Sequence, residues 1–242
     1  MANQVSLMVY LQHGPQALPI VDQGQSTQNT RNDSYGADDI NNVGHWAEFN
    51  LATIQQQYGA ALAGARIADD PFQASPPRPI NSETAVRSRI DAYLTNRVHT
   101  ITNFDVGTMA ATVDNFIPDA AVFNPSLPTN TRPNRLPGDI KPSYKWSMGL
   151  RNHPTPSKET EFNQVLSQVN FYMKQHHARY SFVLTDLELV AVRRLDRNGN
   201  LQLSDSISWT ASGTTFQPQL TVLLGLWYLS MLASRDQDAY LE

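Results

Sequence analysis

The order of periodic segments in the last two-thirds of the chain constrains the fold most strongly. Apolar residues recur at helical spacing in three segments, 81–98, 157–177 and 219–234. Short apolar segments typical of strands lie between them, at 116–123, 138–141, 179–185, 189–195 and 201–209. Helices and strands that alternate in this way pack in layers. The sequence therefore predicts an α/β fold with a central mixed sheet flanked by helices.

The first forty residues differ in composition from the rest of the chain. They are rich in Gln, Asn, Asp and Ser and follow neither a helical nor a strand period. Because such a segment buries little apolar area to offset chain entropy, we expect it to be extended or poorly ordered. A helix is expected only over 46–67. The sequence predicts two parts: a polar, partly ordered N-terminal extension over residues 1–80 and a folded domain over residues 81–242.

Composition and charge exclude several classes of protein. Cysteine is absent, which excludes disulfides, thiolate metal sites and cysteine nucleophiles. The net charge of −4 excludes wholesale electrostatic binding to nucleic acid but not a local basic patch. The first residues lack the pattern of a secretory signal, and the longest apolar run, 222–233, is too short to cross a bilayer. We expect an intracellular protein, nuclear or cytoplasmic, that is not secreted and has no membrane partner.

Two acidic residues and a lysine stand in or beside the short apolar strands. Asp119 follows Pro118, and Asp139 and Lys141 flank Ile140. Alternate residues of a strand share a face, so the Asp139 carboxylate and the Lys141 ammonium should project side by side. If Asp119 comes from the adjacent strand, the three groups converge. Two carboxylates suit Mg²⁺, and the lysine can orient or activate a water or stabilise charge on a phosphate.

The helix expected at 157–177 carries a polar stripe beside its apolar one. Gln164, Gln168 and Tyr172 are spaced i, i+4, i+8 and so share one side of the helix. Next to the strand end, this stripe could hold a metal-bound water or a phosphate oxygen. For Gln164 a solvated helix face is the favoured interpretation. Two structural alternatives stay open: Asp119 as a turn residue and Lys141 as an ion-pair partner only.

These residues, in this order, resemble the PD-(D/E)XK nuclease superfamily. The resemblance rests on Pro118-Asp119, on Asp139-Ile140-Lys141 and on Gln168-Val-Asn-Phe-Tyr172, the last similar to the QxxxY motif of the RecB-type branch. The segments 180–194, 209 and 220–229 are similar to an uncharacterised fungal family of this superfamily. The resemblance covers about residues 81–235.

The resemblance implies a restriction-endonuclease-like core that hydrolyses phosphodiester bonds with Mg²⁺ or Mn²⁺. Asp119 and Asp139 would be metal ligands, the carbonyl of Ile140 would complete the ligand set, and Lys141 would be the catalytic lysine. The substrate would be nucleic acid, more often DNA. The competing hypothesis is a catalytically inactive nuclease fold that serves as a binding or interaction module. The sequence leaves open whether the chain forms a homodimer.

Three further residues take part in the implied site. Gln168 and Tyr172 would support the site from the helix. The superfamily often adds an acidic residue on its first core helix, as a further metal ligand, and Glu83 is the nearest match. Because Glu83 stands at the start of that helix, it is also suited to be a capping-region acid favoured by the helix dipole.

Basic side chains that flank the implied site in the sequence are the expected nucleic-acid interface. Phosphate contacts require Lys and Arg within reach of the cleavage site. A scattered solvated surface is the alternative interpretation. The candidates are Lys145, Arg151, Lys158, Lys174, Arg179, Arg193 and Arg194.

Overall fold

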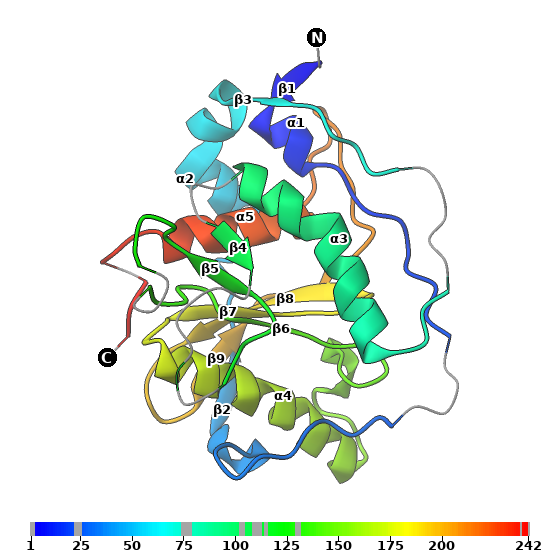
Figure 1. The fold of residues 1–242 in the computed structure, drawn as a ribbon, viewed down its shortest axis with the longest axis vertical. Coiled ribbons are helices and arrows are strands. Elements are labelled where there is room, and N and C mark those ends of the chain that lie inside the picture. Colours follow the sequence, from blue (N-terminus) through cyan, green and yellow to red (C-terminus); the bar gives the residue numbers. More distant parts are fainter. Residues whose placement is uncertain are drawn as a thin grey trace.

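A six-stranded mixed sheet forms the centre of the molecule (Figure 1). This computed structural model describes residues 3–21, 26–73, 79–101, 105–107, 113, 116–128, 132–237 and 239–241. The strand order is β2 (Asn42–His45), β9 (Asn200–Leu203), β8 (Glu188–Arg194), β7 (Tyr180–Leu184) and β6 (Gly138–Ile140), and β10 (Ile207–Ser208) also pairs with β8. The β2–β9 and β6–β7 pairs are parallel and the others are antiparallel. The predicted mixed α/β architecture is confirmed.

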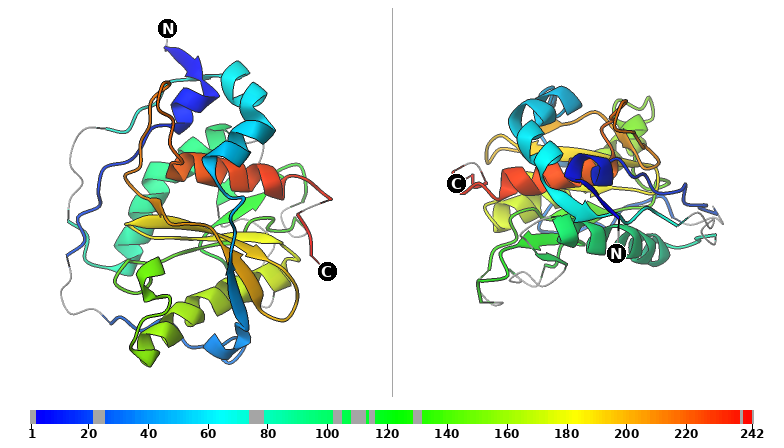
Figure 2. Two further views of the ribbon diagram at one scale, coloured as in Figure 1. Left: turned by 180° about the vertical axis from the view of Figure 1, so that it is seen from behind. Right: turned by 90° about the horizontal axis from the view of Figure 1, so that it is seen from above.

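Helices cover both faces of this sheet, as Figures 1 and 2 show. One face packs against α4 (Pro156–Gln175) and the other against α5 (Val222–Ala233), and α3 (Glu83–Ile101) packs against α5 and β4 (Asp105–Gly107). Beyond α5 lie α1 (Leu7–Leu11) and α2 (Leu51–Gly64). The smaller elements are the pairs β1 (Gln4–Ser6) with β3 (Arg66–Ala68) and β4 (Asp105–Gly107) with β5 (Ala121–Phe123), and the 3₁₀ turns η1 (Ala37–Asp39) and η2 (Met148–Leu150).

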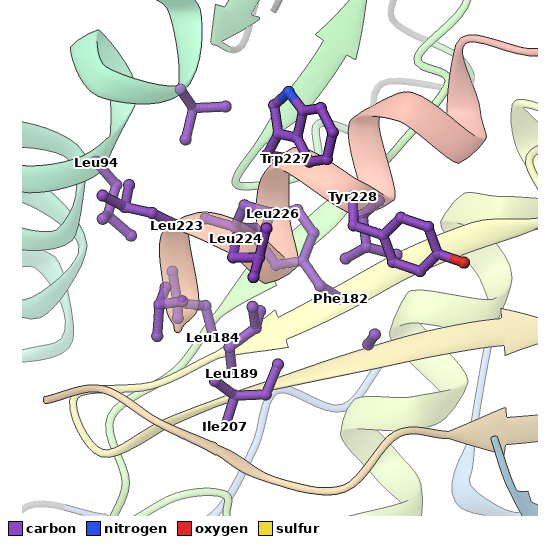
Figure 3. Close-up of a cluster of buried hydrophobic side chains, with 14 of the residues drawn as sticks. Leu94, Phe182, Leu184, Leu189, Ile207, Leu223, Leu224, Leu226, Trp227 and Tyr228 are labelled. Carbon is purple, nitrogen blue, oxygen red and sulfur yellow. The ribbon is translucent and has the colours of Figure 1, made fainter. Parts of the chain in front are cut away.

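The core on the α5 face is made almost wholly of apolar side chains (Figure 3). Every α5 residue except Met231 is buried. Trp227 and Tyr228 lie in this core, and other α5 side chains meet β7 and β8 residues such as Phe182. The Thr221 hydroxyl caps the helix by accepting from the backbone N–H of residue 224 at 3.1 Å. The helix predicted over 219–234 is confirmed over 222–233.

The core on the α4 face is smaller and is built from the apolar stripe that the sequence predicted. The stripe is fully buried against the sheet, and Trp146 stacks on Phe162 with ring centroids 5.4 Å apart. Its members are Phe162, Val165, Leu166, Val169 and Met173. None of the helices in the described ranges combines the length and apolar character that crossing a bilayer requires.

The described residues among the first forty, 3–21 and 26–40, are more ordered than we expected from their composition. They contribute the strand β1, the helix α1 and the buried side chains of Tyr10, Leu11 and Tyr35. The strand β2 then adds to the edge of the main sheet beside β9. The expectation was wrong because these few apolar residues are buried by distant segments, so no local period marks them. The described residues before residue 81 thus share a sheet and a core with the described residues after it.

Candidate active site

The end of β6 brings Asp139 and Lys141 together, as strand alternation predicts. Lys141 Nζ lies 3.2 Å from Asp139 Oδ1, while Ile140 packs into the apolar core on the other face. The preceding Gly138 pairs with Phe182 of β7, and a Cβ at this glycine would lie 2.2 Å from the phenylalanine ring. Glycine therefore leaves room for the Phe182 ring to lie against the backbone of β6, on the face opposite Asp139.

The segment just before β5 delivers Asp119 to the same place. The strand expected over 116–123 is regular only over 121–123, so Asp119 lies in a bend that precedes it. Ala120 pairs with Gly138, which aligns this segment with β6. Asp119 Oδ2 accepts the backbone N–H of Ile140 at 3.0 Å. The two carboxylates and the ammonium group that the sequence singled out therefore converge.

The first turns of α3 add an acid and a base to the cluster. Glu83 Oε2 lies 2.7 Å from Lys145 Nζ, and Glu83 Oε1 lies 3.7 Å from Lys141 Nζ. Arg87 Nη2 lies 2.6 Å from Asp119 Oδ1. Glu83 thus meets two ammonium groups, whereas Ile140 meets Asp119 through its N–H. Neither contact is that of a metal ligand, although both residues border the two aspartates.

The charges of this cluster act strongly on one another because most of them are buried. Burial and the neighbouring Asp139 raise the pKa of Asp119 to about 7, although Lys141 and Arg87 oppose this. Burial alone would lower the pKa of Lys141, but the three nearby carboxylates raise it above its usual value. Partial burial raises the pKa of Glu83, and the lysines and Arg87 outweigh this and lower it. Lys141 is therefore a firmly held cation at neutral pH.

Asp139 is the most unusual group of the cluster. Its side chain is 0% exposed, and neither carboxylate oxygen accepts a regular hydrogen bond from the described residues. Its polar contact there is the ion pair with Lys141. A buried carboxylate ordinarily receives several hydrogen bonds, so these oxygens retain free acceptor capacity. A hard divalent cation would match it.

A divalent cation at this place would have few acidic ligands. Within the ranges that the structure describes, no group of three or more His, Asp or Glu side chains is arranged to hold a metal. A metal here would rest on Asp119 and Asp139 and would keep several waters, which is common for Mg²⁺. Asp119 would release its Arg87 partner in doing so.

The loop after β6 is fixed by a second buried aspartate. Asp186, 2% exposed, accepts the backbone N–H of Ser143 at 2.6 Å and its hydroxyl at 2.7 Å. Because Ser143 is two residues after Lys141, these bonds hold the lysine end of β6 in place. No local pattern marks Asp186, since it stands in a turn where aspartate is common.

The residues of the predicted polar stripe on α4 contact two different parts of the molecule. Gln168 Nε2 donates to the Tyr172 hydroxyl at 3.0 Å beside the cluster. Burial, reinforced by Asp139, raises the pKa of Tyr172 to about 12, against the effect of the Gln168 bond. Gln164 is not on a solvated face as favoured above. It is buried and binds Thr30 and Arg31 of the N-terminal region.

Sequence reasoning missed two residues that border the cluster, Arg87 and Tyr35. Arg87 stands one turn after Glu83 on α3, so its placement follows once that helix carries a site residue. Tyr35 is 6% exposed, and Asp139, Lys141 and Asp119 all act on its hydroxyl electrostatically. No local pattern marks it, because it comes from a polar segment more than a hundred residues away in sequence from Asp139.

The predicted nucleic-acid interface does not form one patch. Arg194 is 2% exposed and donates to two backbone carbonyls, those of Ala178 and Leu241, so its place in the interface is corrected to an internal structural role. Arg193 binds Gln202 and lies over the Trp46 ring.

The remaining basic candidates are spread along the molecule. Arg151 donates to the Val43 carbonyl, and Lys145 pairs with Glu83 at the cluster. Lys158 and Lys174 stand at opposite ends of α4, about 24 Å apart along its axis. Arg179 is half-buried where β7 begins. Of the seven, Lys145 alone is joined to the cluster by a described ion pair.

Comparisons with known proteins assign no family to the chain. A scan against protein-family models finds no match, and neither do searches of curated proteins and of solved structures. A functional assignment therefore depends on the geometry of the cluster.

Proposed function

We propose that the chain is a metal-dependent phosphodiester hydrolase that acts on nucleic acid, with DNA as the first substrate to test. The fold supports a restriction-endonuclease-like core: β6 and β7 are parallel neighbours joined through α4, and α3 and β5 precede them. The observation that carries the proposal is Asp139, a buried carboxylate with free acceptor capacity beside Lys141 and Asp119. The PD-(D/E)XK resemblance rests on the same three residues.

Asp119 and Asp139 would hold Mg²⁺ or Mn²⁺, which supplies Lewis-acid activation of the phosphate and of a bound water. Lys141 acts as a cation rather than as a base, because its pKa is raised. It can donate hydrogen bonds to an attacking water or to the phosphate oxygens as negative charge develops there. Because the pKa of Asp119 is raised to about 7, its carboxyl group loses its proton near physiological pH. The resulting carboxylate can then bind a metal ion.

A catalytically inactive binding module is the second candidate, and one observation favours it. Each acid of the cluster already has a basic partner: Arg87 for Asp119, Lys141 for Asp139 and Lys145 for Glu83. A cluster that is neutral without metal can persist as structure alone. This candidate predicts a stable fold that binds no divalent cation at Asp139.

A digestion panel tests the proposal directly. Single- and double-stranded DNA and RNA are incubated with the protein in Mg²⁺, in Mn²⁺ and in chelator. We expect metal-dependent cleavage that falls about 100-fold or more in Asp139→Ala and in Lys141→Ala. Asp205→Ala is the matched control, since Asp205 is an exposed acid that pairs with His45 away from the cluster. Circular dichroism confirms that each variant is folded, and cleavage that survives both site changes contradicts the proposal.

A further inference from the structure

A short N-terminal segment, residues 29–35, is tied to α4 next to the cluster, and we name it the strap. At its start, the backbone N–H of Asn29 donates to Glu161 Oε2 at 2.7 Å, and its side-chain amide donates to the same oxygen at 3.1 Å. The amide also reaches the carbonyl of Lys145 at 3.2 Å. Because Lys145 pairs with Glu83, this end of the strap adjoins the cluster.

The middle of the strap is held by a reciprocal set of bonds. Arg31 forms an ion pair with Glu161, and its Nη1 donates to Gln164 Oε1 at 2.9 Å. Gln164 Nε2 in turn donates to the carbonyl of Thr30 at 3.2 Å. Glu161 and Gln164 stand one turn apart on α4, so the strap follows this helix. The Arg31 side chain is 56% exposed, so solvent screens part of its ion pair, whereas the bond that it donates to the buried Gln164 is less screened.

The far end of the strap seats Tyr35 against the following turns of α4. Its ring centroid lies 5.3 Å from that of Phe171 and 6.4 Å from that of Phe116. The next residue on α4, Tyr172, carries the bond from Gln168 beside the cluster. The strap thus runs from the lysine side of the site to its tyrosine side.

The Tyr35 hydroxyl is available as a donor at this place. Burial raises the pKa of Tyr35, and the carboxylates of Asp139 and Asp119 raise it further, while Lys141 opposes them. A tyrosine phenol carries its proton at neutral pH without any shift, so the hydroxyl can donate a hydrogen bond. The described residues give the hydroxyl no hydrogen-bond partner.

We propose that Tyr35 is a substrate-contacting residue whose hydroxyl donates a hydrogen bond to a non-bridging oxygen of the phosphate at the cluster. The inference rests on the proposed function and assigns a task to the N-terminal region. The strap anchors supply the rigidity that a single contact from a polar segment requires. No covalent step is assigned to Tyr35.

Removing the hydroxyl alone tests the contact. Tyr35→Phe keeps the ring packing, and we expect kcat/KM for oligonucleotide cleavage to fall about tenfold or more, since a bond to a charged acceptor is lost. Binding of a fluorescein-labelled oligonucleotide in chelator, followed by anisotropy, should weaken in the same variant. Tyr10→Phe is the matched control, because Tyr10 is equally buried but lies on α1 beside His13.

Variants that remove the anchors of the strap provide a second, independent test of the Tyr35 contact. Arg31→Ala and Glu161→Gln remove anchors without touching Tyr35, and each should lower cleavage. In the double variant with Tyr35→Phe the losses should be less than additive, because a released strap no longer delivers the hydroxyl. A strap that only stabilises the fold would lower the melting temperature and leave the two losses additive.

The outcomes separate the two proposals. If Asp139→Ala abolishes cleavage while Tyr35→Phe matches the wild type in cleavage and binding, the substrate contact is overturned and the hydrolase stands. If the wild type binds the labelled oligonucleotide but cleaves nothing, the hydrolase fails, and weaker binding by Tyr35→Phe still supports the contact. If the wild type does not bind the oligonucleotide at all, the contact is overturned.

Discussion

The two faces of the sheet at β6 and β7 are both buried, yet they are filled in opposite ways. On the α5 face, Phe182 and Trp227 lie in a large apolar core (Figure 3). Ile140 belongs to the same core. On the other face, Asp139 and Lys141 face further charged side chains. The apolar side stabilises the fold by removing carbon from water. The charged side offers no such gain.

We interpret the charged side as the place where the proposed reaction would occur. Charges taken out of water lose hydration, and their mutual attraction often only offsets that loss. A buried carboxylate with unused acceptor capacity is still harder to explain as a stabilising feature. The apolar face therefore accounts for the fold, and the charged face supports a function.

The largest effect in this comparison should come from the apolar face. Trp227→Ala removes a side chain that is 2% exposed from the centre of the core, so we expect the free energy of unfolding to fall by about 3–5 kcal/mol. Denaturant unfolding measures this, and Trp227→Phe should cost clearly less. A loss below about 1 kcal/mol would mean that the α5 core is not the main source of stability.

A substitution on the charged face should have a smaller effect on the free energy of unfolding, and it should increase stability rather than decrease it. Asp119→Asn removes a carboxylate whose pKa is raised to about 7 in the folded state, above its unfolded value. In the wild type, the contribution of protonated Asp119 to the free energy of unfolding is fully present below about pH 4 and is lost as the pH rises through 7. The asparagine of the variant does not ionise, so the variant does not lose this stability. At pH 8 its free energy of unfolding should therefore exceed that of the wild type by about 1–3 kcal/mol.

The pH dependence decides whether that gain has the stated cause. The stability difference between Asp119→Asn and the wild type should shrink towards zero as the pH is lowered to 4. Denaturant midpoints measured at several pH values give the curve, with Asp205→Asn as an exposed control. A difference that is constant with pH would show that burial of Asp119 is not responsible.

Much of the fold followed from local pattern in the sequence. The apolar stripe of α4 and the uniform apolarity of α5 each determine a helix through nearby residues. The pairing of Asp139 with Lys141 followed from strand alternation, which is also local. Whether Asp119 joins them depends on which strands are neighbours in the sheet. The order of strands in the sheet cannot be read from local sequence pattern, so convergence was predicted only for the case that Asp119 comes from the adjacent strand.

The parts that escaped prediction all depend on contacts between distant segments. Tyr35 and Gln164 acquire their roles because the strap lies on α4, and neither residue has a neighbour in sequence that indicates this. Arg194 was assigned to the surface by its charge, yet it binds carbonyls inside the molecule. Charge and composition predict whether a residue tends to be exposed or buried, whereas tertiary contacts determine which role it has in the folded protein.

Calorimetric titration with Mn²⁺ at pH 8 tests the central claim most directly, with wild type and Asp139→Ala compared side by side. We predict saturable binding to the wild type that Asp139→Ala abolishes while remaining folded. The wild-type affinity should weaken about tenfold per pH unit below pH 7, as Asp119 regains its proton. Equal binding by both proteins, or no binding by the wild type, would contradict the account and leave a buried charge cluster in a non-catalytic module.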